Sequence, residues 1–274
     1  KALEIGPIDS TDSLTPLSEE TYDAALEGAP MSDVSVDEPV VDDEFGTDAA
    51  VTVRYTIHGQ SQSEKITVTD YDKDGEWEII PITIGALTPE DSADLGLTVN
   101  GESFAGDQSI ALLPGAYKVE TDSPYVDVKG GTMIAASGAT EPTWPKYRLT
   151  TKGVSAFRTA VMHDVEDCLA QDTLKAGCGI GTLPSKGQGG WKTVDGTVKR
   201  EMSDELERDL ETMTPTISST DATLAEGAVP SGDLTTTMTC ERDGQQGECE
   251  MFLGGDLGIP TVDLSTPEQT VSWS

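Results

Sequence analysis

Residues 49–82 read AAVTVRYTIHGQSQSEKITVTDYDKDGEWEIIPI, and this stretch decides the fold because its pattern predicts three strands. In the first of them, Val51, Val53 and Tyr55 alternate with polar residues, and the second repeats the alternation. A period of two is typical of strands that bury one face. We therefore expect an antiparallel sheet whose apolar face is covered by a helix or a second sheet.

The turn between the second and third strands fixes the expected register. Asp74-Gly75 favours a two-residue type I′ turn. This turn predicts that Asp70 lies opposite Ile79, a register that puts the apolar residues of both strands on one face.

The charge of the chain excludes several classes of partner. Its 274 residues include 50 Asp and Glu against 17 Lys and Arg, and the formal net charge is −33. Such a chain repels nucleic acids and anionic membrane surfaces. The acidity fits either the attraction of cations and basic partners or, since the acids are dispersed, a solubility device or adaptation to a salty exterior.

The cysteines and the hydropathy indicate an extracytoplasmic protein. No run approaches the ~18 apolar residues of a membrane span, so we expect no direct membrane insertion by this fragment. The first residues lack the pattern of a signal peptide, and we expect any leader or anchor to have been removed. Close pairs of cysteines without zinc-knuckle spacing predict the disulfides Cys168–Cys178 and Cys240–Cys249, which form in oxidising compartments. For the second pair, a type II′ turn at Gly244-Gln245 would set the two cysteines directly opposite each other.

Before the predicted sheet, Thr15-Pro16 indicates the start of a short helix, followed by an irregular strand within residues 31–45. After the sheet, Asn100-Gly101 predicts a hairpin and Pro114-Gly115 a type II turn.

Two further helices and a final sheet are expected towards the C-terminus. Apolar residues at three- and four-residue spacing predict a helix from Val154 to Cys168, and Ser203 to Met213 predicts a second. Alternating residues around Met238 and Met251 predict strands, as do residues 270–273.

Together these patterns predict the α+β class, with two units that each pack a helix on a curved antiparallel sheet. These units flank a small all-β module. The expected domains are residues 1–82, residues 83–147 with a linker, and residues 148–274 with both disulfides.

A calcium site is the one metal site that the sequence suggests. Asp70, Asp72, Asp74 and Glu76 lie at the spacing of a calcium loop, but Pro81 stands where an EF-hand needs its bidentate acid. The residues form either a looser surface site or simply the turn of the hairpin, and we expect no bound metal or cofactor.

Motifs for catalysis are sparse. The chain has two histidines, His58 and His163, and no nucleophile motif; its glycines at 177–190 follow a helix, whereas a phosphate loop opens one. A possible pocket lies beneath the C-terminal helix, where four apolar side chains serve either as its lining or as core: Phe157, Val161, Met238 and Met251.

Several short motifs resemble the ectodomains of actinobacterial cell-envelope proteins that are anchored by a membrane helix or a lipid. The motifs are residues 51–57 with Gly59, residues 75–77, residues 113–117, and a helix with Cys168 followed by Gly177-Cys178-Gly179. The resemblance implies NTF2-like or cystatin-like α+β units, and it carries over no catalytic residue.

The expected function is that of a non-enzymatic extracytoplasmic domain of a cell-envelope protein, structural or partner-binding. Other cell-envelope proteins or a small apolar ligand are the expected partners. The alternatives are a hydrolase or isomerase with an NTF2-like pocket in the C-terminal unit, and a calcium-dependent adhesin built on residues 70–76.

Overall fold

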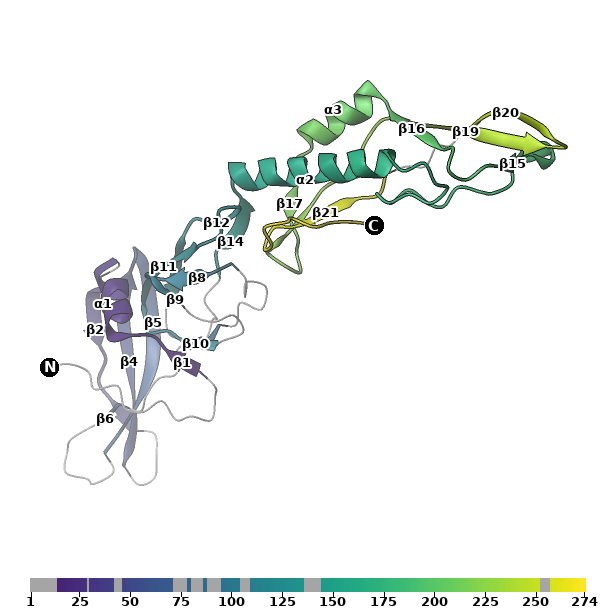
Figure 1. Ribbon diagram of the computed structural model, residues 1–274. Coiled ribbons are helices and arrows are strands. Elements are labelled where there is room, and N and C mark those ends of the chain that lie inside the picture. The colour runs from purple at the N-terminus through teal and green to yellow at the C-terminus, as the bar shows by residue number, and fades with distance from the viewer. Residues whose placement is uncertain are drawn as a thin grey trace. The chain divides into compact units, whose positions relative to one another are not determined.

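The computed structural model describes residues 14–28, 30–41, 46–70, 78–79, 86–87, 95–103, 109–135, 144–251 and 257–274 (Figure 1). The chain divides into two compact units. Unit 1 comprises Lys1–Asp122 and Val128–Lys146, and unit 2 comprises Ser123–Asp127 and Tyr147–Ser274. Helices and mainly antiparallel sheets make up the described residues, as expected for the α+β class.

The centre of unit 1 is the hairpin of β4 (Asp48–Ile57) and β5 (Gln60–Thr69). His58 and Gly59 connect the strands with positive φ angles of 49° and 74°, as a type I′ turn requires. Val51 lies opposite Ile66, and the buried positions of β4 include Tyr55 and Ile57. The alternation predicted for these two strands is therefore present, with one face in the core.

The hairpin is extended on both sides. On one side β4 pairs with β2 (Ser32–Val36) and β3 (Val40–Val41), and on the other side β5 pairs with β6 (Glu78–Ile79). The register of β6 differs from the prediction by two residues, because Ile79 lies opposite Val68 and not Asp70. A shift of two residues keeps every side chain on its face, so the alternation alone could not detect it.

Two further sheets belong to unit 1. The first runs in the order β13 (Thr132–Ala135), β11 (Gly115–Thr121), β8 (Leu97–Val99) and β9 (Glu102–Ser103). The second runs in the order β1 (Leu14–Pro16), β10 (Ser109–Ala111) and β7 (Ala86–Leu87). Asn100 and Gly101, both with positive φ, form the hairpin turn between β8 and β9 that the sequence predicted.

Helix α1 (Glu19–Gly28) packs on β11, and this contact explains two differences from the sequence predictions. Pro16 ends the strand β1, and the helix begins after Ser18, whose Oγ accepts the Thr21 N–H at 3.3 Å. Gly115 starts β11 without a positive φ, so the type II turn expected there is absent. A Cβ at Gly115 would lie 2.9 Å from the Ala25 Cβ, so the glycine allows the helix to approach the strand.

Unit 2 contains α2 (Thr151–Leu169) and α3 (Asp204–Thr212), which pack against each other. The side chain of Thr150 caps α2 by accepting the Gly153 N–H, and Ser203 caps α3 by accepting the Leu206 N–H. Both helices agree with the sequence prediction.

The strands of unit 2 form two four-stranded sheets. One contains β15 (Lys192–Thr193), β19 (Leu234–Arg242) and β16 (Lys199–Met202), with β20 (Gln245–Met251) paired to β19. The other runs in the order β17 (Thr216–Ile217), β18 (Leu224–Glu226), β21 (Pro260–Asp263) and β22 (Val271–Trp273). The remaining elements are the 3₁₀ helix η1 (Gln188–Gly190) and the pair β12 (Val126–Lys129) and β14 (Lys146–Leu149).

The hairpin of β19 and β20 also differs from its predicted register by two residues. Arg242 lies opposite Gln245, so the turn consists of Asp243 and Gly244, whose φ angles of 52° and 78° identify a type I′ turn. The expected type II′ turn at Gly244-Gln245 is therefore wrong. Cys240 and Cys249 are diagonal neighbours on one face and form a disulfide with a Cα–Cα distance of 5.8 Å.

The predicted division into three domains stays a prediction. The two compact units group residues 83–122 with residues 1–82, and the change of unit at Tyr147 lies next to the expected boundary.

Candidate interaction surface

The predicted calcium residues are only partly described by the structure. Asp70 follows β5 and is buried, and its N–H donates to the Thr47 carbonyl at 2.7 Å. Asp72, Asp74 and Glu76 lie outside the described residues. Within the described ranges, no cluster of three or more metal-binding side chains is present. The calcium site therefore stays a prediction.

The four residues of the predicted pocket lie in different surroundings. Phe157 is fully buried, and its ring lies within contact distance of Gly227, as do Met213 and Pro260. Met238 belongs to a separate cluster with Leu183, Val198 and Cys240, against which Met251 packs. Val161 is buried on α2. Phe157, Val161 and Met238 are buried and Met251 is half-buried. The pocket stays a prediction.

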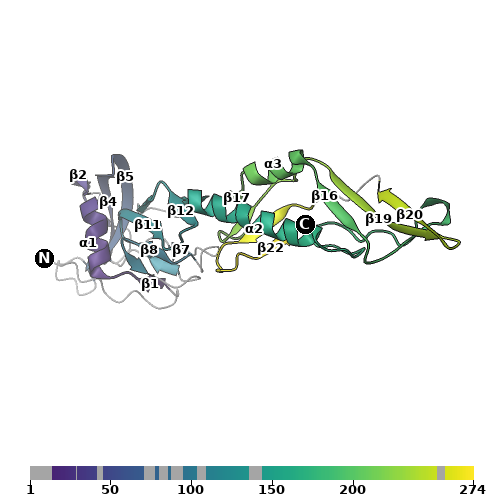
Figure 2. The same cartoon turned by 45° about the horizontal axis from the view of Figure 1, so that its top comes forward.

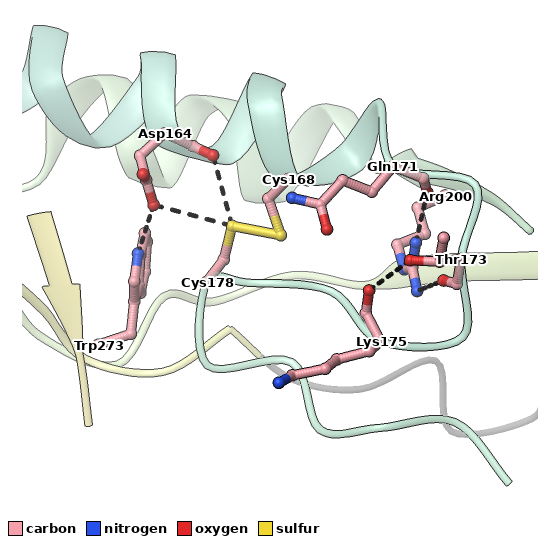
Figure 3. Close-up of a disulfide and its surroundings, with 8 residues drawn as sticks. All are labelled: Asp164, Cys168, Gln171, Thr173, Lys175, Cys178, Arg200 and Trp273. Atoms are coloured by element: carbon pink, nitrogen blue, oxygen red, sulfur yellow. Dashed lines mark hydrogen bonds between the residues drawn. A yellow bond between two sulfur atoms is a disulfide. The ribbon is translucent and has the colours of Figure 1, made fainter.

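The disulfide Cys168–Cys178 joins the last turn of α2 to the loop that follows it (Figure 3). Beside it, the Trp273 indole N–H donates to Asp164 Oδ2 at 2.6 Å, which fastens β22 to α2. Cys178 Sγ lies 3.9 Å from the same carboxylate oxygen. Asp164 therefore has a structural partner and does not face an empty pocket.

Arg200 of β16 is a buried cation close to this disulfide (Figure 3). Its Nη1 donates to the Gln171 carbonyl at 2.6 Å and its Nη2 to the Thr173 carbonyl at 2.9 Å. Burial lowers the pKa of the guanidinium. The carbonyls follow the C-terminus of α2, where a helix carries partial negative charge, so the cation stabilises the chain there.

Both histidines are exposed in the structure. His58 is an exposed residue of the turn between β4 and β5. His163 is on the exposed side of α2, with Nδ1 3.5 Å from Asp167 Oδ2. This is an ordinary surface pair one helical turn apart.

Exposed apolar side chains are concentrated in one segment of unit 1. Seven large apolar side chains are exposed among the residues that the structure describes, and six of these belong to residues 26–41. We call these six the edge patch: Leu26, Met31, Val34, Val36, Val40 and Val41. The seventh is Val229 in unit 2. Clustering of this kind marks interaction sites, whereas scattered single side chains do not.

The patch follows the outer side of the largest sheet. β2 and β3 both pair with β4, and all their residues are exposed. Val36 lies opposite Val53 and Val41 opposite Ala49, so these two valines continue the apolar face of β4 beyond the buried part. Val40 lies opposite Ala50 and is therefore on the other face of the sheet. Figures 1 and 2 show β2 beside β4, on the side away from β5.

β2 presents an open backbone edge. It is the terminal strand in the order β2-β4-β5-β6, and no strand pairs with its other side among the described residues. The Asp37 N–H donates inward to the Thr52 carbonyl at 2.8 Å. Because inward and outward groups alternate in an antiparallel pair, the N–H and C=O of Val36 point outward.

The segment that carries the patch is acidic, and Arg54 of β4 is an exposed base beside it. Residues 19–41 contain seven Asp and Glu and no Lys or Arg, and no basic residue occurs between Lys1 and Arg54. Four of the acids, Glu19, Glu20, Asp23 and Glu27, are exposed on α1. Asp37 forms an exposed ion pair with Arg54 at 2.5 Å, which lowers the pKa of the carboxyl through the hydrogen bond.

A network of hydrogen bonds holds α1 beside the patch. Glu102 Oε2 accepts the Ser18 N–H at 2.9 Å and the Thr21 hydroxyl at 2.6 Å. Partial burial raises the pKa of Glu102, but these bonds outweigh it and lower the pKa below its usual value. Asn100 adds a bond from Nδ2 to the Thr21 carbonyl at 3.1 Å. The start of α1 is therefore fixed by β9 and its turn.

Sequence reasoning predicted a strand here but not an interaction surface. The signal that indicates the surface is the coincidence of two patterns: valines at 34, 36, 40 and 41, and a run of 52 residues without a base between Lys1 and Arg54.

Comparisons with protein-family models, curated proteins and solved structures find no match to this chain.

Proposed function

We propose that this protein is a non-enzymatic extracytoplasmic domain that binds a partner protein through the edge patch. The observation that carries the proposal is the clustering of six of the seven exposed large apolar side chains on residues 26–41. An exposed valine gains roughly 1.5–3 kcal/mol when a partner buries it fully, so a few such contacts support specific binding.

The proposed location outside the cytoplasm is supported by both disulfides, since such bonds persist in oxidising compartments. Among the described residues, no helix has the length and apolar character needed to cross a membrane. The resemblance to actinobacterial cell-envelope ectodomains points to the same compartment and to partners in the envelope.

Site-specific crosslinking on cells that produce the protein tests this function. A photo-reactive residue is placed at Val36, and at Val229 as the matched control, because these two valines are 63% and 62% exposed. We expect one discrete crosslinked product from position 36, lost when Val34→Lys is added, and none from position 229. Equal products from both positions, or none from position 36, would refute the proposal.

A further inference from the structure

We propose that the edge patch takes a partner segment in extended conformation, in which β-branched apolar residues alternate with Lys or Arg, as an additional strand beside β2. This inference rests on the proposed function and specifies its partner. It follows from three properties of β2: its outward backbone groups, the alternation of its side chains and its acidic surroundings.

The backbone of β2 offers hydrogen bonds to a neighbouring strand. Ser35 and Asp37 direct their backbone groups towards β4, so Val36 presents its N–H and C=O to the open side. An incoming strand satisfies these groups in the way that strand addition does in other peptide-binding domains.

The side chains of β2 determine the pattern of the partner. Val36 lies on the same face as Val53, whereas Ser35 and Asp37 lie on the opposite face with Arg54. A strand paired with β2 therefore contacts Val36 on one face and Asp37 on the other. Alternating apolar and basic residues in the partner match both faces at once.

The charge of the surroundings selects basic partners. Seven carboxylates and no basic residue lie within residues 19–41, and one of the seven, Asp37, is ion-paired with Arg54 of β4. The segment with this pair included keeps an excess of negative charge. A cationic segment is attracted to this side of unit 1, whereas an acidic one is repelled. A second copy of the chain would bring together two such acidic edges, so like charges disfavour self-association through β2.

Only a short stretch of β2 can form backbone hydrogen bonds with a partner strand. Pro39 has no N–H, and the register slips both between Ser32 and Ser35 and between β2 and β3. Pairing is therefore limited to the few residues around Val36. An interface of this size gives a weak and reversible complex.

A synthetic peptide provides the probe. The test peptide is Ac-TKVKVKVKT-amide, and the control carries the same sequence with N-methyl groups on the valines, which cannot donate to a neighbouring strand. Binding is measured by titration calorimetry, and hydrogen exchange locates it. We expect the test peptide to protect residues 32–38 from exchange, and the methylated peptide to bind at least about tenfold more weakly, which corresponds to roughly 1.4 kcal/mol.

Three variants separate strand addition from simple charge attraction. Val36→Lys places a repelling charge on the surface, and Val36→Pro removes the outward N–H, a change that edge strands tolerate when that group faces solvent. We expect each to weaken binding by about tenfold. The matched control Val229→Lys adds the same charge in unit 2 and should change the affinity by less than about twofold.

The outcomes distinguish this inference from the function on which it rests. Equal affinity of both peptides, or equal losses in Val36→Lys and Val229→Lys, would overturn strand addition by a basic segment. If crosslinking at position 36 still gives its discrete product, the partner-binding function stands and only the class of partner is wrong. If crosslinking at position 36 gives no discrete product either, both proposals are wrong.

Discussion

The two long hairpins of the molecule are stabilised by different means. In the hairpin of β4 and β5, buried side chains occur in both strands, including Val51, Ile57 and Val68. In the hairpin of β19 and β20, alternate residues of β19 are buried, but no residue of β20 is. The second hairpin instead carries the disulfide Cys240–Cys249.

The difference teaches that a covalent bond supplements packing where one strand of a hairpin reaches the core only through half-buried residues, here Cys249 and Met251. Burying a large aliphatic side chain contributes roughly 1.5–3 kcal/mol. A disulfide that closes a short ring contributes a similar amount, about 2–3 kcal/mol, by restricting the unfolded chain. The disulfide thus stabilises the hairpin of β19 and β20 by an amount similar to the stabilisation that a buried side chain of β5 gives to the first hairpin.

The largest effect is expected from truncating the core of the first hairpin. Ile57 is fully buried, so Ile57→Ala should destabilise the hairpin of β4 and β5 by about 3 kcal/mol through lost burial and a cavity. Urea unfolding followed by hydrogen exchange over residues 48–69 measures this loss. The matched change Gln246→Ala on exposed β20 should alter stability by less than about 0.5 kcal/mol. If Ile57→Ala and Gln246→Ala lose similar amounts of stability, the contrast between a buried and an exposed strand is wrong.

The next effect concerns the disulfide of the second hairpin. We expect the double variant Cys240→Ala/Cys249→Ala to lose about 2–3 kcal/mol of stability in unit 2, because the unfolded chain is no longer restricted. Hydrogen exchange over residues 234–251 should accelerate, while exchange over residues 48–69 stays as in the native protein. If exchange over residues 48–69 accelerates by the same factor, the disulfide does not stabilise the second hairpin alone.

A smaller effect is expected at Glu102, which fixes the start of α1. Glu102→Gln should cost about 1 kcal/mol at neutral pH, the usual size of a helix-capping contribution. Because folding lowers the pKa of Glu102, its stabilisation is present above the unfolded-state pKa of about 4.3 and is lost as the pH falls through the folded-state pKa. Thermal unfolding at several pH values should therefore show the variant and the native protein converging in acid. A difference that persists unchanged at low pH would rule out the carboxylate as the cause.

The smallest effect on stability is expected from Val36→Lys in the edge patch. Val36 is 63% exposed, so we expect a change of less than about 0.5 kcal/mol in urea unfolding. This result would show that loss of binding in this variant does not come from unfolding. A loss of several kcal/mol would mean that the valine supports the sheet and not a partner.

Local signals in the sequence predicted the features that depend on neighbouring residues. Asn100-Gly101 forms its hairpin, and the two helices of unit 2 form where predicted, because each needs only the chemistry and spacing of nearby residues. Both cysteine pairs also form as predicted, since a short ring leaves few other arrangements.

Features that depend on distant parts of the chain were not predictable in the same way. Two registers were wrong by two residues, because alternation defines the face of a strand but not its offset. The edge patch was not predicted, for a related reason. Valines on a strand are typical of a buried face. Whether they are buried depends on another element that covers them, and residues 31–41 carry no information about such an element.

Pro39 has a consequence for how the protein behaves at high concentration. Proteins with open sheet edges can polymerise, since each added strand offers a fresh template for the next. Here Pro39 and the register shifts limit strand pairing along β2 to a few residues. The acidic residues around β2 also repel the same edge of a second molecule. A partner strand bound as we propose would therefore not start a filament, and the protein could bind through this edge and still stay monomeric at high concentration.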